Sequence, residues 1–200
     1  TAAWPITSIS WLTWCSAWAW AGSGPFVGTK LVAGYFGGTR TPLAVSWPKQ
    51  IKADNTVRTQ FQHVNDIAPT VYDILDIQAP KTVNGIAQGP IDGISMRYTF
   101  ADAQAKPRKP AQYFEVLGSR GLYQDGWMAS VFGPRVPWVQ GFAQFMGWNP
   151  NNDQWALFKL DSDYSQATDL AGSHPEKLAE LQAEFDRQAK ANHVSPLGAG

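Results

Sequence analysis

The sequence predicts a mixed α/β chain (α+β taken as a fragment) that ends in a small antiparallel sheet packed against one long helix. Three observations predict this class. A short apolar run at residues 42–47 is followed by a helical pattern near residues 66–77. Short strand patterns separated by turn residues then follow between residues 111 and 160. An amphipathic helical pattern over residues 174–191 completes the order.

Residues 1–24 form a tryptophan-rich segment that has no clean period, so no element is assigned to it. Five of the ten tryptophans lie here: Trp4, Trp11, Trp14, Trp18 and Trp20. Packing is the favoured role because an indole brings a large apolar surface, and a sugar-stacking platform is the alternative. The single cysteine, Cys15, excludes a disulfide within this sequence and is interpreted as inert.

The next stretch combines a glycine-rich loop, a strand and a helix. Residues 25–40 are predicted to form a loop or short strand that leads into a turn. Pro42–Trp47 (PLAVSW) suits a buried strand that Pro48 closes. Asp66 is a plausible N-cap with Pro69 in the first helical turn. The helix should end near residue 77, with an apolar face made of Ile67, Val71, Ile74 and Leu75.

Residues 78–110 are rich in glycine, proline, lysine and asparagine and are predicted to be a long surface excursion. A meander follows, in which turns are expected at Gly118–Gly121 and Asp125–Gly126, and residues 133–154 are loop-like. Its predicted strands are Tyr113–Leu117, Leu122–Gln124, Trp127–Val131 and Trp155–Leu160.

The last helix is well signalled at its start. Ser173 and Glu176 have the spacing of a capping box, and Pro175 falls in the first turn. The apolar stripe of this helix is Leu178, Leu181, Phe185 and Ala189.

Charge and hydropathy exclude two classes of partner. Sixteen basic residues balance sixteen acidic ones, so no basic field favours nucleic acid or an anionic membrane surface. No stretch reaches the roughly 18–20 apolar residues of a membrane span. The N-terminus does not resemble a signal peptide, and both cytoplasm and periplasm remain open as compartments.

No complete catalytic constellation is visible in the residue pattern. His63, His174 and His193 lack the spacing of metal ligands and are interpreted as structural or surface residues. The clustered carboxylates Asp161 with Asp163, and Asp73 with Asp76, fall in a turn and at a helix end. Lys30 differs, because a lone cation in a glycine-rich loop can present a point charge to an anion.

Five stretches in the same order resemble the C-terminal half of bacterial arylsulfatases, which belong to the alkaline-phosphatase-like superfamily. The first carries the lysine, the glycine pair and the x-Arg-x-Pro of that family, and the second resembles its D-I-x-P-T helix. The stretches are GTKLVAGYFGGTRTPLAVSWP (28–48), FQHVNDIAPTVYDILDI (61–77), APKTVNGIAQGPIDGISMRYTFADA (79–103), QYFEVLGSRGLYQDGWMAS (112–130) and WALFKLDSDYSQATDLAGSHPEKLAEL (155–181).

The resemblance implies a domain organisation and a reaction. Residues 25–110 would be the end of the catalytic α/β domain, and residues 111–200 the C-terminal antiparallel-sheet subdomain with its helix at 174–191. The family hydrolyses sulfate monoesters with a formylglycine nucleophile and a divalent cation, usually calcium. Charge builds on the sulfate and leaving oxygens during that reaction, so cations must be placed there in advance.

Only one site residue transfers from the family, and it is Lys30, which matches the lysine that contacts the sulfate. Cys15 is not followed by the required proline and arginine, so it is not the formylglycine precursor. The nucleophile and the metal ligands are expected upstream of residue 1. Phe36 stands where the family often has glutamate, whereas Gly37, Gly38 and Arg40 are retained.

Three functions are therefore weighed. The leading one is part of a sulfatase whose partners are a sulfate ester and a missing N-terminal catalytic part. Phosphonate or phosphodiester hydrolysis in the same superfamily is the second. A truncated domain without catalytic activity is the third, and this chain by itself is expected to be inactive because the nucleophile is elsewhere.

Overall fold

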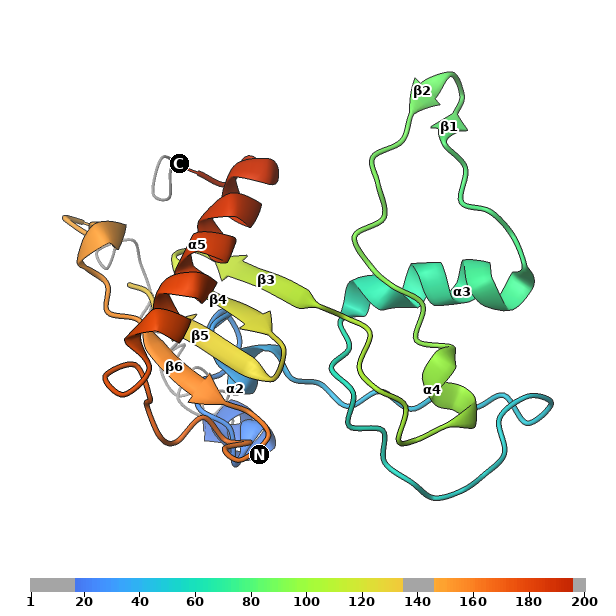
Figure 1. Ribbon diagram of the computed structural model, residues 1–200, viewed down its shortest axis with the longest axis horizontal. Helices are drawn as coiled ribbons and strands as arrows, with labels where there is room; N and C mark the ends of the chain where they lie inside the picture. The colour runs from blue at the N-terminus through green and yellow to red at the C-terminus, as the bar shows by residue number, and fades with distance from the viewer. Residues whose placement is uncertain (1–16, 135–145, 196–200) are drawn as a thin grey trace, which may run out of the picture. The chain divides into compact units, whose positions relative to one another are not determined.

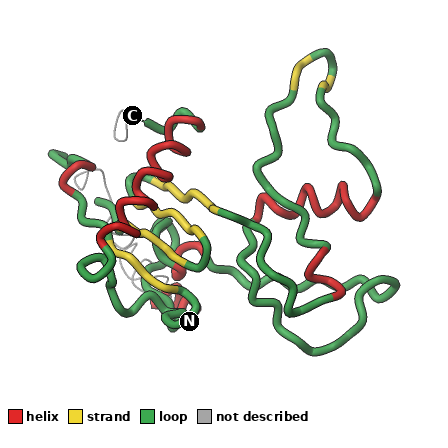
Figure 2. Tube along the Cα trace, in the orientation of Figure 1, coloured by secondary structure: helices red, strands yellow, loops and turns green. Residues whose placement is uncertain are grey.

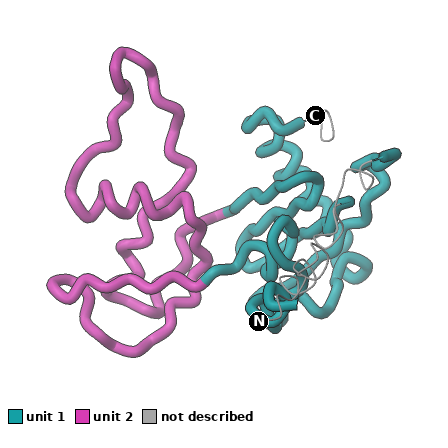
Figure 3. Tube along the Cα trace, turned by 180° about the vertical axis from the view of Figure 1, so that it is seen from behind, with its two compact units in different colours: residues 1–41, 111–200 teal, residues 42–110 magenta. Residues whose placement is uncertain are grey.

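The computed structural model describes residues 17–134 and 146–195. Cys15 and the tryptophans before residue 16 lie outside the described residues. The chain divides into two compact units, residues 1–41 with 111–200 (unit 1) and residues 42–110 (unit 2), which Figure 3 colours separately. The domain boundary predicted at residue 110 between a catalytic part and a C-terminal subdomain stays a prediction.

Unit 1 is built on a four-stranded antiparallel sheet in the order β3-β4-β5-β6. The strands are β3 (Ala111–Val116), β4 (Ser119–Gln124), β5 (Trp127–Val131) and β6 (Ala156–Lys159). Two-residue turns at Leu117–Gly118 and Asp125–Gly126 join the first three, and all four turn residues have positive φ. The predicted meander is confirmed, except that residues 119–121 of the predicted Gly118–Gly121 turn lie inside β4.

Helix α5 (Pro175–Ala191) covers one face of this sheet, as Figure 1 shows. Its Leu181, Phe185 and Ala189 are buried against sheet residues, with Leu178 partly buried at the edge of the same cluster. The predicted stripe is confirmed, because residues at this spacing share one helix face. The sheet contributes Leu122, Ala129 and Leu157 to the core.

The predicted capping box of α5 is wrong. His174 is the N-cap and its side chain accepts no capping hydrogen bond. The Ser173 hydroxyl instead donates to the Leu170 carbonyl oxygen at 3.1 Å, so the turn before the helix uses the group that a capping box requires.

Residues 27–40 cover the other face of the sheet and include α2 (Phe36–Thr39). Alternation along the strands puts Gly121, Ser130 and Phe158 on this face. The Tyr35 ring lies 5.8 Å from that of Phe158, centroid to centroid. A Cβ on Gly34 would stand 2.5 Å from the Arg120 carbonyl oxygen, so glycine lets this segment approach the sheet backbone.

Unit 2 is mostly loop, as Figure 2 shows, and its elements are short. They are the 3₁₀ turn η1 (Val64–Asp66), α3 (Ile67–Leu75), β1 (Thr82–Val83), β2 (Ile86–Ala87) and α4 (Tyr98–Ala101). The predicted helix and the long excursion after it are confirmed. Helix α3 ends where Asp76 adopts a left-handed conformation with φ 53°.

The predicted strand Pro42–Trp47 is wrong, because these residues form no strand and are largely exposed. Leu43 is 58% exposed and Val45 47%. A strand needs a neighbour for its backbone N–H and C=O groups, and the described residues provide none here. No helix in the described parts of the chain is long and apolar enough to cross a membrane.

The apolar face predicted for α3 exists but is not covered within unit 2. Ile67, Val71 and Leu75 are 44%, 48% and 58% exposed.

Because exposed apolar surface of this kind drives association, we expect sedimentation velocity to show that the chain self-associates as its concentration rises. Val71→Glu combined with Leu75→Lys should shift it towards monomer, whereas Ile86→Lys, at a residue 69% exposed in β2, should not. Equal sedimentation of all three proteins at every concentration would contradict this expectation.

Candidate functional site

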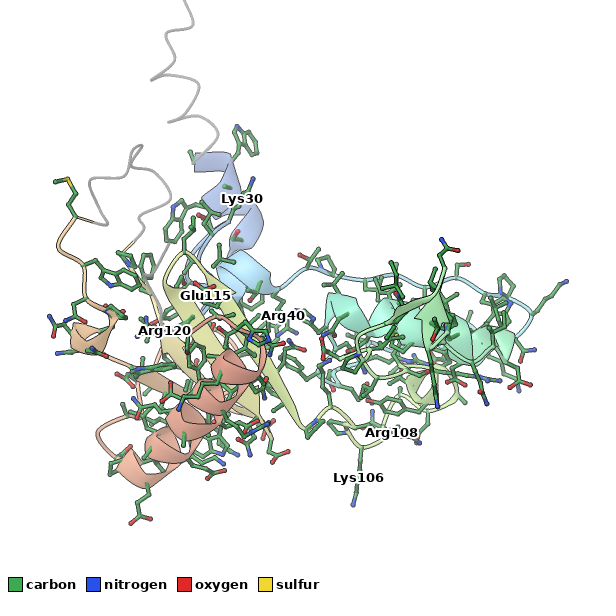
Figure 4. The ribbon with its side chains drawn as sticks, turned by 90° about the horizontal axis from the view of Figure 1, so that it is seen from above. Lys30, Arg40, Lys106, Arg108, Glu115 and Arg120 are labelled. Atoms are coloured by element: carbon green, nitrogen blue, oxygen red, sulfur yellow. The ribbon has the colours of Figure 1, made fainter. Side chains whose placement is uncertain are left out.

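Lys30 lies at the tip of a tight turn in unit 1 and is exposed. The turn is closed by the Val32 N–H, which donates to the Thr29 carbonyl oxygen at 3.0 Å. Leu31, the third residue of the turn, has φ 78°, a conformation that costs a non-glycine residue free energy. No hydrogen bond or ion pair within residues 17–134 and 146–195 engages the Lys30 ammonium group, which is therefore available to a ligand. Figure 4 labels it on the segment before α2.

The glycine pair Gly37–Gly38 brings α2 against the backbone of this turn. A Cβ on Gly37 would stand 2.0 Å from the Gly28 carbonyl oxygen, and one on Gly38 would stand 2.1 Å from the Val32 carbonyl oxygen. The Gly37 N–H also donates to the Val27 carbonyl oxygen at 2.9 Å. The pair is thus a packing requirement of the turn that carries Lys30.

Arg40 stacks on aromatic rings of unit 1. Its guanidinium carbon lies 4.0 Å from the ring centroid of Tyr164, and 5.3 Å and 5.4 Å from those of Phe26 and Phe36. Cation–π contacts of this kind fasten the residue after α2 to the loop that follows β6. Phe36 therefore contributes an apolar ring to this stack.

The backbone between Lys30 and Arg40 is bound by polar side chains from distant parts of unit 1. Gln166, only 3% exposed, accepts from the Phe36 N–H through Oε1 at 2.8 Å and donates to the Gly34 carbonyl oxygen at 3.2 Å. Ser130 Oγ donates to the same carbonyl oxygen at 2.6 Å, and Ser119 Oγ accepts from the Gly34 N–H at 3.3 Å. The residue pattern did not reveal these groups, because isolated polar residues in a loop or strand carry no periodic signal.

The histidines lie apart from Lys30 in the chain and make contacts that suit structural roles. His63 caps η1 through Nδ1, which accepts from the Asn65 N–H at 3.3 Å. Burial lowers the pKa of His63, and the nearby Lys109 charge lowers it further. The His174 ring lies 5.3 Å from the Trp127 ring, centroid to centroid, and His193 is exposed beyond α5.

The carboxylates singled out in the sequence also bind within their own loops or units. Asp163 accepts backbone N–H groups from Ala167 and Thr168 at 3.0 Å and 2.8 Å, and these bonds hold its pKa below the ordinary value despite partial burial. Asp73 pairs with Arg97 at 3.1 Å. Within the described residues no group of three or more His, Cys, Asp or Glu is placed to hold a metal ion, so these residues do not fit a calcium site.

No protein-family model matches this chain. Its fold is similar to that of Ps i-CgsB, with a TM-score of 0.60 and 19% identity over 83% of this chain and 32% of that one. The same values hold for Ps i-CgsB in complex with k-i-k-neocarrahexaose. A third similar structure is BT33336S-sulf, from work on glycosaminoglycan metabolism by Bacteroides thetaiotaomicron. Its TM-score is 0.51, with 20% identity over 80% of this chain and 31% of that one.

These structures are of sulfatases, and the chain spans about a third of their length. The fold that matches is mixed α/β, with the four-stranded antiparallel sheet packed against α5. At this level of identity the similarity is one of fold. The chain therefore has the fold of a portion of a sulfatase.

Proposed function

We propose that this chain is part of a sulfatase that hydrolyses sulfate monoesters, and that Lys30 binds the sulfate group of the substrate. The observation that supports it best is the exposed Lys30 ammonium group, which has no partner among the described residues and lies on a turn that is held against the sheet of a sulfatase-like fold. A cation whose charge is not already compensated is what an anionic substrate group requires.

The role of Lys30 follows from the charge changes of the reaction. Hydrolysis breaks the bond between sulfur and the alcohol oxygen, water supplies the new oxygen on sulfur, and the alcohol leaves with a proton. Negative charge shifts onto the sulfate and leaving oxygens, and a fixed ammonium group stabilises it. The nucleophile and any calcium ion would be held by residues outside this chain.

The substrate class is proposed in two forms. An aryl sulfate follows from the resemblance of five sequence stretches to arylsulfatases. A carbohydrate sulfate is favoured by a different observation, the complex of the similar protein Ps i-CgsB with k-i-k-neocarrahexaose. Comparing initial rates on 4-nitrophenyl sulfate and on sulfated oligosaccharides distinguishes the two, and an aryl phosphodiester tests the alternative reaction.

The test of the proposal is Lys30→Ala in a protein that contains this chain together with its catalytic part. We expect kcat to fall about 10²–10³-fold, the range seen when one donor to a developing negative charge is removed. The matched control is Lys190→Ala, another exposed lysine of unit 1, which lies in the last turn of α5. It should leave kcat within about twofold.

Two outcomes would overturn the proposal. Full activity in the Lys30→Ala enzyme would exclude Lys30 as the sulfate-binding cation. Absence of any sulfate release by the unchanged protein with calcium present, together with turnover of a phosphodiester, would exclude sulfate ester hydrolysis.

A further inference from the structure

We infer that Gln166 is a positioning residue, which holds the turn carrying Lys30 in register with the sheet of unit 1. The inference rests on the proposed function for its catalytic meaning, because Lys30 is the group that is positioned. The proposed role of Gln166 involves no contact with a substrate. It acts through the backbone of Gly34 and Phe36, four and six residues after Lys30.

The side-chain amide uses both of its ends. Oε1 accepts from the Phe36 N–H at 2.8 Å, and Nε2 donates to the Gly34 carbonyl oxygen at 3.2 Å and to Ser130 Oγ at 3.3 Å. The bonds to Phe36 and Gly34 join residues that are 130 and 132 positions apart in the sequence, and the bond to Ser130 joins residues 36 positions apart. Because the amide is buried, each group left unbonded after a substitution would cost its full desolvation penalty.

Gln166 is itself held by the loop that follows β6. Its backbone has φ 59°, and its N–H donates to the Asp163 carbonyl oxygen at 3.3 Å. The Asp163 carboxylate accepts the next two backbone N–H groups, and Tyr164 stacks on Arg40 at 4.0 Å. The loop is thus fastened on both sides of Gln166, and a strained residue persists only when its surroundings determine its conformation.

The chemistry at this position requires a side chain that both accepts and donates a hydrogen bond. Only a group with an acceptor and a donor can serve the Phe36 N–H and the Gly34 carbonyl oxygen together. Methionine has a similar shape and offers neither bond. An ionised glutamate keeps the acceptor but places a negative oxygen against the Gly34 carbonyl oxygen, whereas a protonated glutamate again has one donor and one acceptor.

The first test uses backbone hydrogen exchange in the 200-residue chain and needs no activity. Gln166→Met should raise the exchange rates of Val32, Gly37 and Gly38, whose amides are bonded within the 27–38 segment, by about tenfold or more. The rates in β5 and α5 should change much less. The control is Leu181→Ala, which creates a cavity on the opposite face and should raise exchange throughout unit 1.

Gln166→Glu adds a readout that simple filling of space would not produce. Once protonated, the introduced carboxyl can both accept and donate, as the amide does. The ratio of the Gly37 amide exchange rate in Gln166→Glu to that in the wild type at the same pH should therefore fall back towards one as the pH drops below the pKa of this carboxyl. Burial raises the pKa of such a group, so this recovery should begin above the usual range of a glutamate.

The second test measures hydrolysis in a protein that also contains the catalytic part. Gln166→Met should lower kcat about tenfold or more and change KM by less than about threefold, since a displaced Lys30 loses its contact mainly with the transition state. The inference would be overturned if Gln166→Met raised exchange rates equally throughout unit 1. It would also be overturned if the Gly37 exchange rate of Gln166→Glu relative to wild type did not change with pH. The same conclusion would follow if Gln166→Met left kcat unchanged although Lys30→Ala abolished activity. If Lys30→Ala keeps full activity while the exchange results hold, the proposed function fails and Gln166 still positions the turn.

Discussion

Replacing Lys109 by methionine is expected to destabilise unit 2 by about 3–5 kcal/mol, the range found when one partner of a buried ion pair is removed. Lys109 and Asp66 are 3% and 0% exposed at their side chains, and Lys109 Nζ donates to Asp66 Oδ1 at 2.7 Å. The substitution leaves the Asp66 carboxylate buried without a countercharge. Lys109 Nζ also donates to Asn65 Oδ1 at 2.9 Å, and that oxygen would lose its donor too.

The effect should be large because Asp66 connects separate segments of unit 2. Its carboxylate accepts the His63 N–H at 2.7 Å and the Ile94 N–H at 2.9 Å, and its carbonyl oxygen accepts from Thr70 Oγ1 at 2.6 Å. The segment before α3, the helix itself and the stretch near residue 94 therefore share one buried group. A shift of this carboxylate towards solvent would break its bonds to the His63 and Ile94 N–H groups together.

The measurement is urea denaturation in which hydrogen exchange of peptides from unit 2 reports the unfolding. A probe of unit 2 alone is needed because the two units need not unfold together. Asp66→Asn combined with Lys109→Met should recover part of the lost free energy, because no unpaired charge is then buried. The matched control is Arg97→Met, which removes an exposed pair with Asp73 and should cost no more than about 1 kcal/mol. Equal destabilisation by Arg97→Met and Lys109→Met would contradict this account of unit 2.

The C-terminal half of the fold was predictable because its signals are local. The Asp125–Gly126 turn, the strands on either side of it and the α5 stripe all follow from residues a few positions apart. Asp66 shows where local reasoning fails. It sits where an N-cap was predicted, yet its carboxylate binds the backbone of η1 and of Ile94 together with Lys109, a residue 43 positions away.

The Pro42–Trp47 strand failed for a related reason, because composition predicts a tendency to pair but cannot supply the neighbour. Lys30 was predicted as a sulfate-binding residue from its glycine-rich surroundings and from resemblance to a family. The structure adds the strained turn at Leu31 and the close backbone contacts of the glycine pair. Gln166 was missed because an amide in a polar loop has no pattern to separate it from surface residues. Its partners lie more than thirty positions away and become neighbours only in the folded sheet.

The second large effect is expected from Gly37→Ala, which should destabilise unit 1 and displace the Lys30 turn. The new methyl group would stand 2.0 Å from the Gly28 carbonyl oxygen and 2.5 Å from that of Val27. Both atoms belong to the backbone, so no flexible side chain can move aside, and α2 must separate from the turn. Overpacking in a well-packed region costs about 1–3 kcal/mol, and a clash with backbone should reach or exceed the upper end.

Thermal unfolding monitored by circular dichroism measures this cost, and exchange of the Gly37 amide reports the local separation. Gly172→Ala is the matched control, because nothing lies within 4 Å of a Cβ at Gly172 and its φ is not positive. The control should unfold at nearly the wild-type temperature. If Gly37→Ala does the same and keeps its amide protected, the close approach of α2 to the Lys30 turn is not a feature of the protein in solution. A lower melting temperature with unchanged amide exchange rates in the sheet would instead show that Gly37→Ala disrupts the turn. In a protein that also contains the catalytic part, kcat should then fall nearly as much as it does in Lys30→Ala.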